Sequence, residues 1–259
     1  MTTNFYAPPS AIRAGRVVLP EDEARHLRTV LRGEQGDEMT VVDGTGGWYR
    51  AEITHAGPEQ VVGTVVERRD NVGEPAVDVT VALGLLKKRS RFETFVEKAV
   101  ELGVRRIVPL RTSRAERESI REERLRNVMV AAMKQCRRSR LPALAAPQST
   151  ADLLAASGGD VRLVCHAGNA SVPIQQAAMA QVRPSASVLV LVGPEGGFAP
   201  SEVETAQAHG CTPVSLGPRR LRAETAGLAA LHAVAGLAPS TTDGARSQGQ
   251  SRHGPSGHP

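Results

Sequence analysis

Residues 191–202 read LVGPEGGFAPSE, and this stretch decides the fold class. An apolar run from Val188 to Val192 ends there on Gly193-Pro194-Glu195-Gly196-Gly197. Short, continuous apolar runs that stop at glycine and proline are typical of strands buried on both faces, as in parallel sheets. We therefore expect a buried strand that delivers a glycine-rich loop and one carboxylate to the edge of a sheet.

The segments on both sides of this stretch alternate between strand and helix patterns. Ser201 followed by Glu204 predicts a capping box for a helix that ends near Gly210. Alternation of this kind predicts an α/β fold with a mostly parallel sheet that helices cover on both faces. The predicted strands span 77–83, 104–110, 161–165, 188–192 and 212–216, and the predicted helices span 92–100, 122–138 and 224–237.

The first part of the chain follows a different pattern. Apolar side chains at Ala24, Leu27, Val30 and Leu31 share helical spacing and predict one short helix over residues 21–31. Short β-branched runs at regular spacing predict a small β-barrel around it. The predicted strands of this barrel lie at 16–19, 38–42, 48–53 and 61–66.

These patterns divide the chain into two domains and a tail. We expect a β-barrel domain over residues 1–72 and an α/β domain over residues 76–238, joined by a linker at 71–75. Residues 239–259 are rich in Ser, Gly, Pro and His, and such a composition predicts disorder because it buries too little apolar surface.

Charge is concentrated in the middle of the chain. Residues 87–140 carry 17 Lys and Arg against 7 Asp and Glu, whereas the formal net charge of the whole chain is only +5. This asymmetry favours a polyanionic partner such as nucleic acid. The alternative is that these charged residues lie on solvent-exposed helix faces and bind no partner.

Cysteine and histidine are sparse and scattered. Cys136, Cys165 and Cys211 lie far apart in no metal-ligand spacing, so we expect reduced thiols in a cytoplasmic protein and no metal site. No apolar stretch of about 18 residues is present, and we expect no contact with a membrane.

Three predicted strand ends carry unusual residues, in the segments 165–168, 193–197 and 216–225. All three lie on the carboxyl side of the sheet, where parallel sheets bind ligands, so they can line one pocket. Gly196 and Gly197 let a ligand approach the bare backbone. A tight turn with a solvent-facing acid is the alternative reading of the same glycines.

The arginines of the third segment favour an anionic ligand. Arg219, Arg220 and Arg222 lie within four residues of a strand end, although Glu224 can also cap a helix and pair with Arg222. Neither the GxxxxGK(S/T) loop of nucleoside triphosphatases nor a GxGxxG that opens a helix is present. These absences argue against a nucleoside triphosphatase and against a dinucleotide oxidoreductase.

Residues 193–225, with GPEGGF and SLGPRRLRAET, closely resemble the 16S ribosomal RNA (uracil-N3)-methyltransferases of the SPOUT superfamily, which modify the uridine usually numbered 1498. Residues 98–104 resemble the first helix and strand of that family's catalytic domain, and residues 26–44 resemble its PUA-like RNA-binding domain. The helix at 132–140 departs from the family at Lys134, where Glu is common, and at Arg137, where a small residue is common.

The resemblance implies a C-terminal trefoil knot that binds S-adenosyl-L-methionine, and a homodimer formed through the knot. Threaded chains are rare, so pattern reasoning alone does not predict a knot. The cofactor-binding residues implied by the family are His166, Gly193, Glu195, Gly196, Gly197, Leu216, Gly217, Arg219, Leu221 and Thr225.

The partner implied by the resemblance is 16S rRNA in the small ribosomal subunit, and the reaction is methyl transfer to N3 of a uridine. Arg222 is the candidate for stabilising the uracil anion, and Glu224 for accepting the N3 proton or orienting Arg222. The residues expected to contact RNA are His26, Arg28, Arg32, Lys87, Lys88, Arg89, Arg91, Arg137, Arg138 and Arg140.

Two other functions fit parts of the sequence. A non-catalytic RNA-binding or ribosome-assembly factor with the same fold explains the barrel and the basic segment equally well. A cofactor-dependent enzyme that acts on a small molecule is consistent with the parallel sheet, but this function does not account for the positive charge of residues 87–140.

Overall fold

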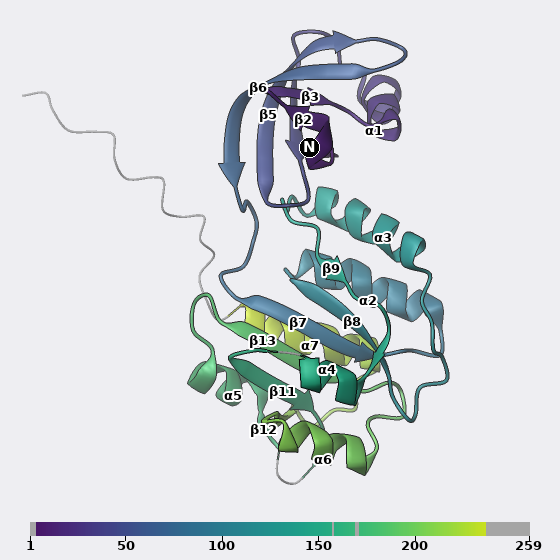
Figure 1. The fold of residues 1–259 in the computed structure, drawn as a ribbon, viewed down its shortest axis with the longest axis vertical. Coiled ribbons are helices and arrows are strands. Elements are labelled where there is room, and N and C mark those ends of the chain that lie inside the picture. Colours follow the sequence, from purple (N-terminus) through teal and green to yellow (C-terminus); the bar gives the residue numbers. More distant parts are fainter. Residues whose placement is uncertain (1–3, 157, 169–170, 237–259) are drawn as a thin grey trace, which may run out of the picture.

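The computed structural model describes residues 4–156, 158–168 and 171–236 (Figure 1). The predicted tail, 239–259, lies outside these ranges. The N-terminal strands form one six-stranded sheet that is curled into a half-barrel, in the order β1-β4-β5-β6-β3-β2. All its pairs are antiparallel except β1 with β4. The strands are β1 (Phe5–Tyr6), β2 (Ile12–Arg13), β3 (Arg16–Val18), β4 (Glu38–Val42), β5 (Gly47–Ala56) and β6 (Val61–Asp70).

The helix predicted over residues 21–31 changes its winding halfway. An α-helix, α1 (Glu21–His26), continues into a π-helical segment, η2 (Leu27–Leu31), and a 3-10 turn, η1 (Pro9–Ala11), precedes both. Leu27 is buried, but Val30 and Leu31 are 62% and 46% exposed, so the predicted apolar face is wrong for these two residues. A π turn holds more residues than an α turn, and it rotates the last side chains away from the core.

Every strand pair in the second sheet is parallel, in the order β10-β8-β7-β13-β11-β14-β12 with β9 beside β8. The apolar run from Val188 to Val192 forms β13, which lies between β7 and β11. This confirms the predicted parallel sheet. The strands are β7 (Asp78–Gly84), β8 (Arg106–Arg111), β9 (Ala143–Leu144), β10 (Gln148–Ser149), β11 (Val161–Cys165), β12 (Val172–Pro173), β13 (Ser187–Val192) and β14 (Thr212–Ser215).

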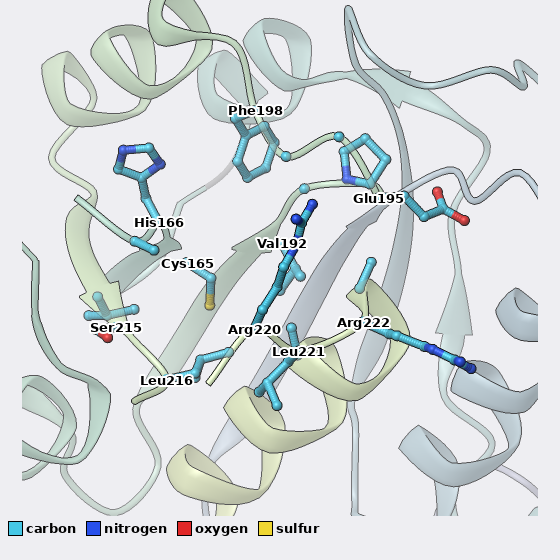
Figure 2. A pocket seen from close by; sticks show the side chains of 18 of the residues that line it. Cys165, His166, Val192, Glu195, Phe198, Ser215, Leu216, Arg220, Leu221 and Arg222 are labelled. Atoms are coloured by element: carbon cyan, nitrogen blue, oxygen red, sulfur yellow. The ribbon is translucent and has the colours of Figure 1, made fainter. Parts of the chain in front are cut away.

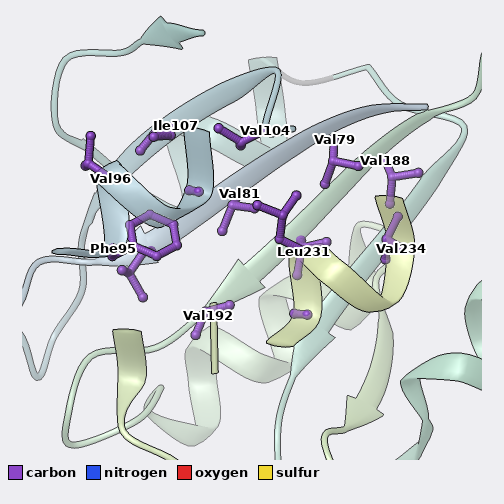
Figure 3. Close-up of a cluster of buried hydrophobic side chains, with 14 of the residues drawn as sticks. Val79, Val81, Phe95, Val96, Val104, Ile107, Val188, Val192, Leu231 and Val234 are labelled. Carbon is purple, nitrogen blue, oxygen red and sulfur yellow. The ribbon is translucent and has the colours of Figure 1, made fainter. Parts of the chain in front are cut away.

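Helices cover both faces of this sheet. One face packs against α2 (Arg89–Glu101), α3 (Glu122–Gln135), α5 (Ile174–Gln181) and α7 (Ala223–Ala235). The other face packs against α4 (Thr150–Ala156) and α6 (Pro200–Ala208). Figure 3 shows the first core, where Phe95 and Leu231 from two helices meet Val81 and Val192 from the sheet. Each fully buried side chain of this kind contributes about 1.5–3 kcal/mol.

The start of α6 differs from the prediction. The helix begins at Pro200, and the Glu202 carboxylate accepts a hydrogen bond from the Ala199 N–H at 2.8 Å. The predicted capping box of Ser201 and Glu204 is therefore wrong by two residues, because proline suits the first helical position. Glu202 also accepts hydrogen bonds from the backbone N–H and the hydroxyl of Ser113, at 3.0 and 3.1 Å. It thus ties the loop after β8 to α6.

The segment predicted as a linker is fixed to the second domain. The side-chain oxygen of Asn71 accepts a hydrogen bond from Arg140 Nε at 2.7 Å, and the Val72 carbonyl accepts one from the Ser139 N–H at 3.0 Å. Glu74 is buried and its carboxylate binds Arg138. The connection between the two sheets is therefore packed and hydrogen-bonded rather than free.

Candidate active site

The carboxyl ends of β11, β13 and β14 surround a cavity of about 630 Å³ (Figure 2). Its walls come from the segments 165–167, 192–198 and 214–223, with Arg114 and Ala226 beside them. The three strand ends that were predicted to line one pocket therefore meet at one place. The volume lies within the range of about 300–1,000 Å³ that is typical of small-molecule sites.

Most of the predicted cofactor-binding residues lie on the walls of this cavity. Thr225 is the exception among the expected cofactor residues, since it is exposed on α7 and does not line the cavity. Arg222 lines the cavity, whereas Glu224 is buried at the start of α7. The other expected cofactor residues on the walls are His166, Gly193, Glu195, Gly196, Gly197, Leu216, Gly217, Arg219 and Leu221.

The glycine-rich loop, residues 193–197, adopts a conformation that larger residues at Gly193 and Gly197 would disturb. A Cβ atom on Gly193 would lie 2.8 Å from the carbonyl carbon of Gly197, because the loop folds back on itself. Gly197 has a φ of +68°, a conformation that favours glycine, and a Cβ atom there would meet nothing within 4 Å. The loop thus leaves bare backbone facing open space, as a ligand cradle requires.

The Glu195 carboxylate is turned away from the centre of the cavity. It accepts a hydrogen bond from the Lys87 N–H at 3.3 Å and lies 3.7 Å from Arg91 Nη1. Figure 2 shows it pointing away from Cys165 and His166. Glu195 therefore fastens the glycine-rich loop to the start of α2, a contact that its place in the sequence did not indicate.

Arg91 lies between two carboxylates. Its Nε atom is 3.7 Å from Glu224 Oε1, and its Nη1 atom contacts Glu195. The second oxygen of Glu224 is buried and has no hydrogen-bond partner among the described residues. The ion pair of Glu224 is thus made with Arg91 rather than with Arg222, and the charge of Arg91 is already compensated within the protein.

Arg114 is a site residue that sequence reasoning missed. Its Nη1 atom donates a hydrogen bond to the Gly196 carbonyl at 2.8 Å, and its side chain lines the cavity. The loop after β8 carries it, 82 residues from Gly196 in the chain. Its position in the basic middle segment was the only signal, and no motif distinguished it from its neighbours.

The residues expected to contact RNA fall into different environments. Lys87, Lys88 and Arg137 are exposed, as is Arg32 at the end of η2. Arg28 is half-buried and bonds the Ala24 carbonyl, His26 packs edge-on against Phe5, and Arg89 is half-buried.

Arg138 does not have the exposed position that was expected of an RNA-contacting residue. It is only 2% exposed, and its guanidinium binds both oxygens of Glu74 and the carbonyl oxygens of Val100 and Val104. A buried guanidinium that already makes these hydrogen bonds is not accessible to a phosphate, so the expectation that Arg138 contacts RNA is wrong. The sequence showed its charge but not its partner, 64 residues earlier in the chain.

The described ranges contain neither a metal-binding cluster nor a helix that could span a membrane. No three His, Cys, Asp or Glu side chains there are grouped in a way that can hold a metal ion. No helix in those ranges is long and apolar enough to cross a membrane.

Desolvation raises the pKa of the Cys165 thiol beside the cavity to about 12, so this thiol stays protonated at neutral pH.

Both parts of the chain match known families. Residues 73–235 match the RNA methyltransferase domain, and residues 19–66 match the RNA methyltransferase PUA domain. The chain is 32% identical over 243 residues to the ribosomal RNA small subunit methyltransferase E of Synechocystis sp., covering 92% of this chain and 78% of that protein. The enzyme of the same name from Mycobacterium tuberculosis is 32% identical over 241 residues, covering 89% and 90%.

Solved structures give the same result. The ribosomal RNA small subunit methyltransferase E of Neisseria gonorrhoeae, bound to S-adenosyl methionine, superposes with a TM-score of 0.80 at 27% identity. The match covers 92% of this chain and 98% of that protein. The likeness therefore extends over the curled sheet, the parallel sheet and the cavity between its strand ends. The chain belongs to the ribosomal RNA small subunit methyltransferase E family.

Proposed function

We propose that this protein transfers a methyl group from S-adenosyl-L-methionine to N3 of one uridine in 16S rRNA of the small ribosomal subunit. The observation that carries the proposal is the cavity itself. Three strand ends, far apart in the sequence, meet there and bring together most of the cofactor-binding residues that the family resemblance implies.

The walls of the cavity fit S-adenosyl-L-methionine. Apolar side chains such as Leu216 and Leu221 offer surfaces for a flat adenine ring. Gly197 and Gly217 both have positive φ, and a Cβ atom on either would meet nothing within 4 Å, so their backbone groups are open to a ligand. We propose that these residues and Gly193 hold the adenosyl part, with Arg114 and Arg219 near the carboxylate of the methionyl part.

S-adenosyl-L-methionine supplies a methyl group on a positively charged sulfur. The N3–methyl bond would form as the sulfur–methyl bond breaks, which leaves S-adenosyl-L-homocysteine, and the N3 proton would pass to water. Holding the two partners in line removes much of the entropic barrier. We propose that Arg222 donates hydrogen bonds to a uracil carbonyl and stabilises the charge that develops when N3 loses its proton.

Glu224 fits a supporting role better than that of proton acceptor. It is buried and does not line the cavity, and it forms an ion pair with Arg91 at 3.7 Å. We propose that Glu224 and Glu195 together hold Arg91 in place. Figure 2 shows the Arg222 side chain extending toward the side of the cavity where Glu195 lies.

RNA approaches from that same side in our proposal. N3 lies on the pairing edge of uracil, so the base must be unpaired and turned out of its helix to react. Lys87 and Lys88 are exposed at the start of α2, next to Glu195 and Arg91, and can bind the flanking phosphates. Arg137 and, on the half-barrel, Arg28 and Arg32 are further candidates. The trefoil knot, and a homodimer formed through the knot, remain predictions from the family resemblance.

Two measurements test the proposal. Calorimetric titration of S-adenosyl-L-methionine should show binding at one site per chain. The protein should then transfer a labelled methyl group to small ribosomal subunits or to free 16S rRNA, and mass spectrometry should place that group on N3 of a uridine. RNA binding without binding of the methyl donor would favour a non-catalytic assembly factor instead.

A further inference from the structure

The end of α3 and the turn that follows it, residues 134–140, contact the half-barrel at two separate places. At the first, Lys134 Nζ lies 2.5 Å from Glu23 Oε1 of α1. The two side chains are only 21% and 11% exposed. Figure 1 shows α3 lying directly beneath the half-barrel, between that domain and α2. This ion pair therefore joins the two domains across a largely buried contact.

The second contact involves the backbone on both sides. The Gly46 N–H donates to the Ser139 carbonyl at 3.1 Å, and the Leu141 N–H donates to the Gly44 carbonyl at 2.9 Å. Arg140 also bridges to Gly44 and Thr45. The turn between β4 and β5 is thus hydrogen-bonded to the chain that follows α3.

The turn after α3 is itself anchored in the second domain. Arg138 binds the Glu74 carboxylate at 2.6 Å and the Val100 and Val104 carbonyls at 2.7 and 3.0 Å. Breaking a buried pair of this kind leaves an uncompensated charge and is strongly unfavourable. Movement of the half-barrel is therefore resisted by Lys134 on one side and by residues 139–141 on the other.

A contribution to folding stability does not explain the Lys134–Glu23 ion pair. Buried ion pairs give little net stabilisation, and the second oxygen of Glu23 is buried without a hydrogen-bond partner among the described residues. Such a pair does specify one orientation of the half-barrel relative to the second domain, because both charges are compensated only in that orientation. Since Lys134 is already paired with Glu23, this lysine is also a poor phosphate ligand.

We infer that Lys134 and Glu23 are positioning residues for the methylation of RNA: they set the angle between the half-barrel and the catalytic domain, so that RNA held by the first presents its uridine to the cavity of the second. The inference rests on the proposed function. Misplacing a substrate by about 1 Å can lower the rate about a hundredfold, so a small rotation of the half-barrel is sufficient.

Charge reversal tests this inference with a matched control. Glu23→Lys places two cations together at the domain contact, whereas Glu21→Lys makes the same charge change on the same helix, where Glu21 pairs with Arg25 in an exposed contact. The double variant Glu23→Lys with Lys134→Glu restores an ion pair in reversed order. For each protein, kcat and KM with small subunits, the Kd for S-adenosyl-L-methionine and the melting temperature are measured.

We expect Glu23→Lys to lower kcat/KM for RNA about tenfold or more, with the Kd for the methyl donor unchanged, and the double variant to recover most of that loss. Glu21→Lys should match the wild type or bind RNA slightly better. A direct phosphate contact by Lys134 predicts the opposite sign for Glu23→Lys, since added positive charge would then strengthen RNA binding.

Equal kcat/KM for Glu23→Lys and Glu21→Lys would overturn the inference, as would a double variant no better than the worse single variant. If Glu23→Lys does not fold, Glu23→Gln with Lys134→Met removes both charges without leaving one buried, and unchanged kcat/KM for that protein would also overturn it. A wild-type protein that transfers no methyl group would refute the proposed function, whereas an active wild type with insensitive variants refutes only the positioning role.

Discussion

The Glu195 carboxylate accepts a hydrogen bond from the Lys87 N–H at 3.3 Å, although the two residues are 108 positions apart in the chain. This contact joins the glycine-rich loop after β13 to the turn between β7 and α2. Arg91 adds a cation 3.7 Å from the same carboxylate. The acid in GPEGG therefore holds the loop in place and does not point at the centre of the cavity.

We expect Glu195→Ala to raise the Kd for S-adenosyl-L-methionine about fivefold or more, because the loop loses its tie to α2. Glu195→Gln keeps an acceptor oxygen for the Lys87 N–H and should lose less. Calorimetric titration measures both values. A Glu195→Ala protein that binds the methyl donor as tightly as the wild type would show that the contact does not matter.

Gly197 and Gly210 form a matched pair for testing the cavity. Their φ angles are +68° and +79°, and a Cβ atom on either would meet nothing within 4 Å. Valine at either position should bring similar backbone strain, about 1–2 kcal/mol or more. Only Gly197 faces the cavity, so Gly197→Val should abolish binding of the methyl donor while Gly210→Val should not. Similar affinities in the two variants would place the cofactor elsewhere.

Arg114→Ala removes the hydrogen bond to the Gly196 carbonyl and one cation from the cavity wall. We expect the Kd for the methyl donor to rise about fivefold to tenfold. Arg124→Ala is the control, since Arg124 pairs with Glu93 on the surface. If both variants bind like the wild type, Arg114 has no part in the site.

Arg222→Ala should separate binding from chemistry. The variant is expected to bind S-adenosyl-L-methionine normally and to lose about a hundredfold or more in kcat, as when one donor to a developing oxyanion is removed. Arg222→Lys keeps the charge but not the paired donors, so it should recover only part of the activity. Single-turnover methylation of small subunits gives the rates, and an unchanged rate for Arg222→Ala would remove this residue from the mechanism.

Binding to RNA should weaken steeply with salt. If about six phosphates are neutralised, affinity should fall roughly a thousandfold between about 50 and 200 mM salt. The number of participating arginines is smaller than the sequence suggests, because Arg138 is buried and Arg91 is paired with two carboxylates. A filter-binding series across this range tests the prediction, and a flat response would exclude an RNA surface built from these residues.

The sequence predicted the features that depend on local pattern. The run Val188 to Val192 indicated a buried parallel strand, and the structure has β13 at Ser187–Val192 in the middle of the sheet. The three glycine-rich or arginine-rich strand ends were expected to meet because parallel strands present their carboxyl ends at one edge. They meet at the cavity that Figure 2 shows.

Features that depend on partners distant in the chain were not predictable from pattern. The burial of Arg138 follows from Glu74, and the role of Arg114 follows from the Gly196 carbonyl. The exposure of Val30 and Leu31 follows from a change of helical winding that apolar spacing does not reveal. The sequence marks Lys134 only as a departure from the family, because its partner Glu23 lies 111 residues away in the chain.

The central claim is methylation of N3 of one uridine in 16S rRNA, and its most direct test is made in the cell. The gene is deleted, and 16S rRNA is digested and mapped by mass spectrometry, with the wild-type gene and the Arg222→Ala gene returned in parallel. The account predicts that N3-methyluridine disappears on deletion, returns with the wild-type gene and does not return with Arg222→Ala. Retention of N3-methyluridine in 16S rRNA after deletion would contradict it.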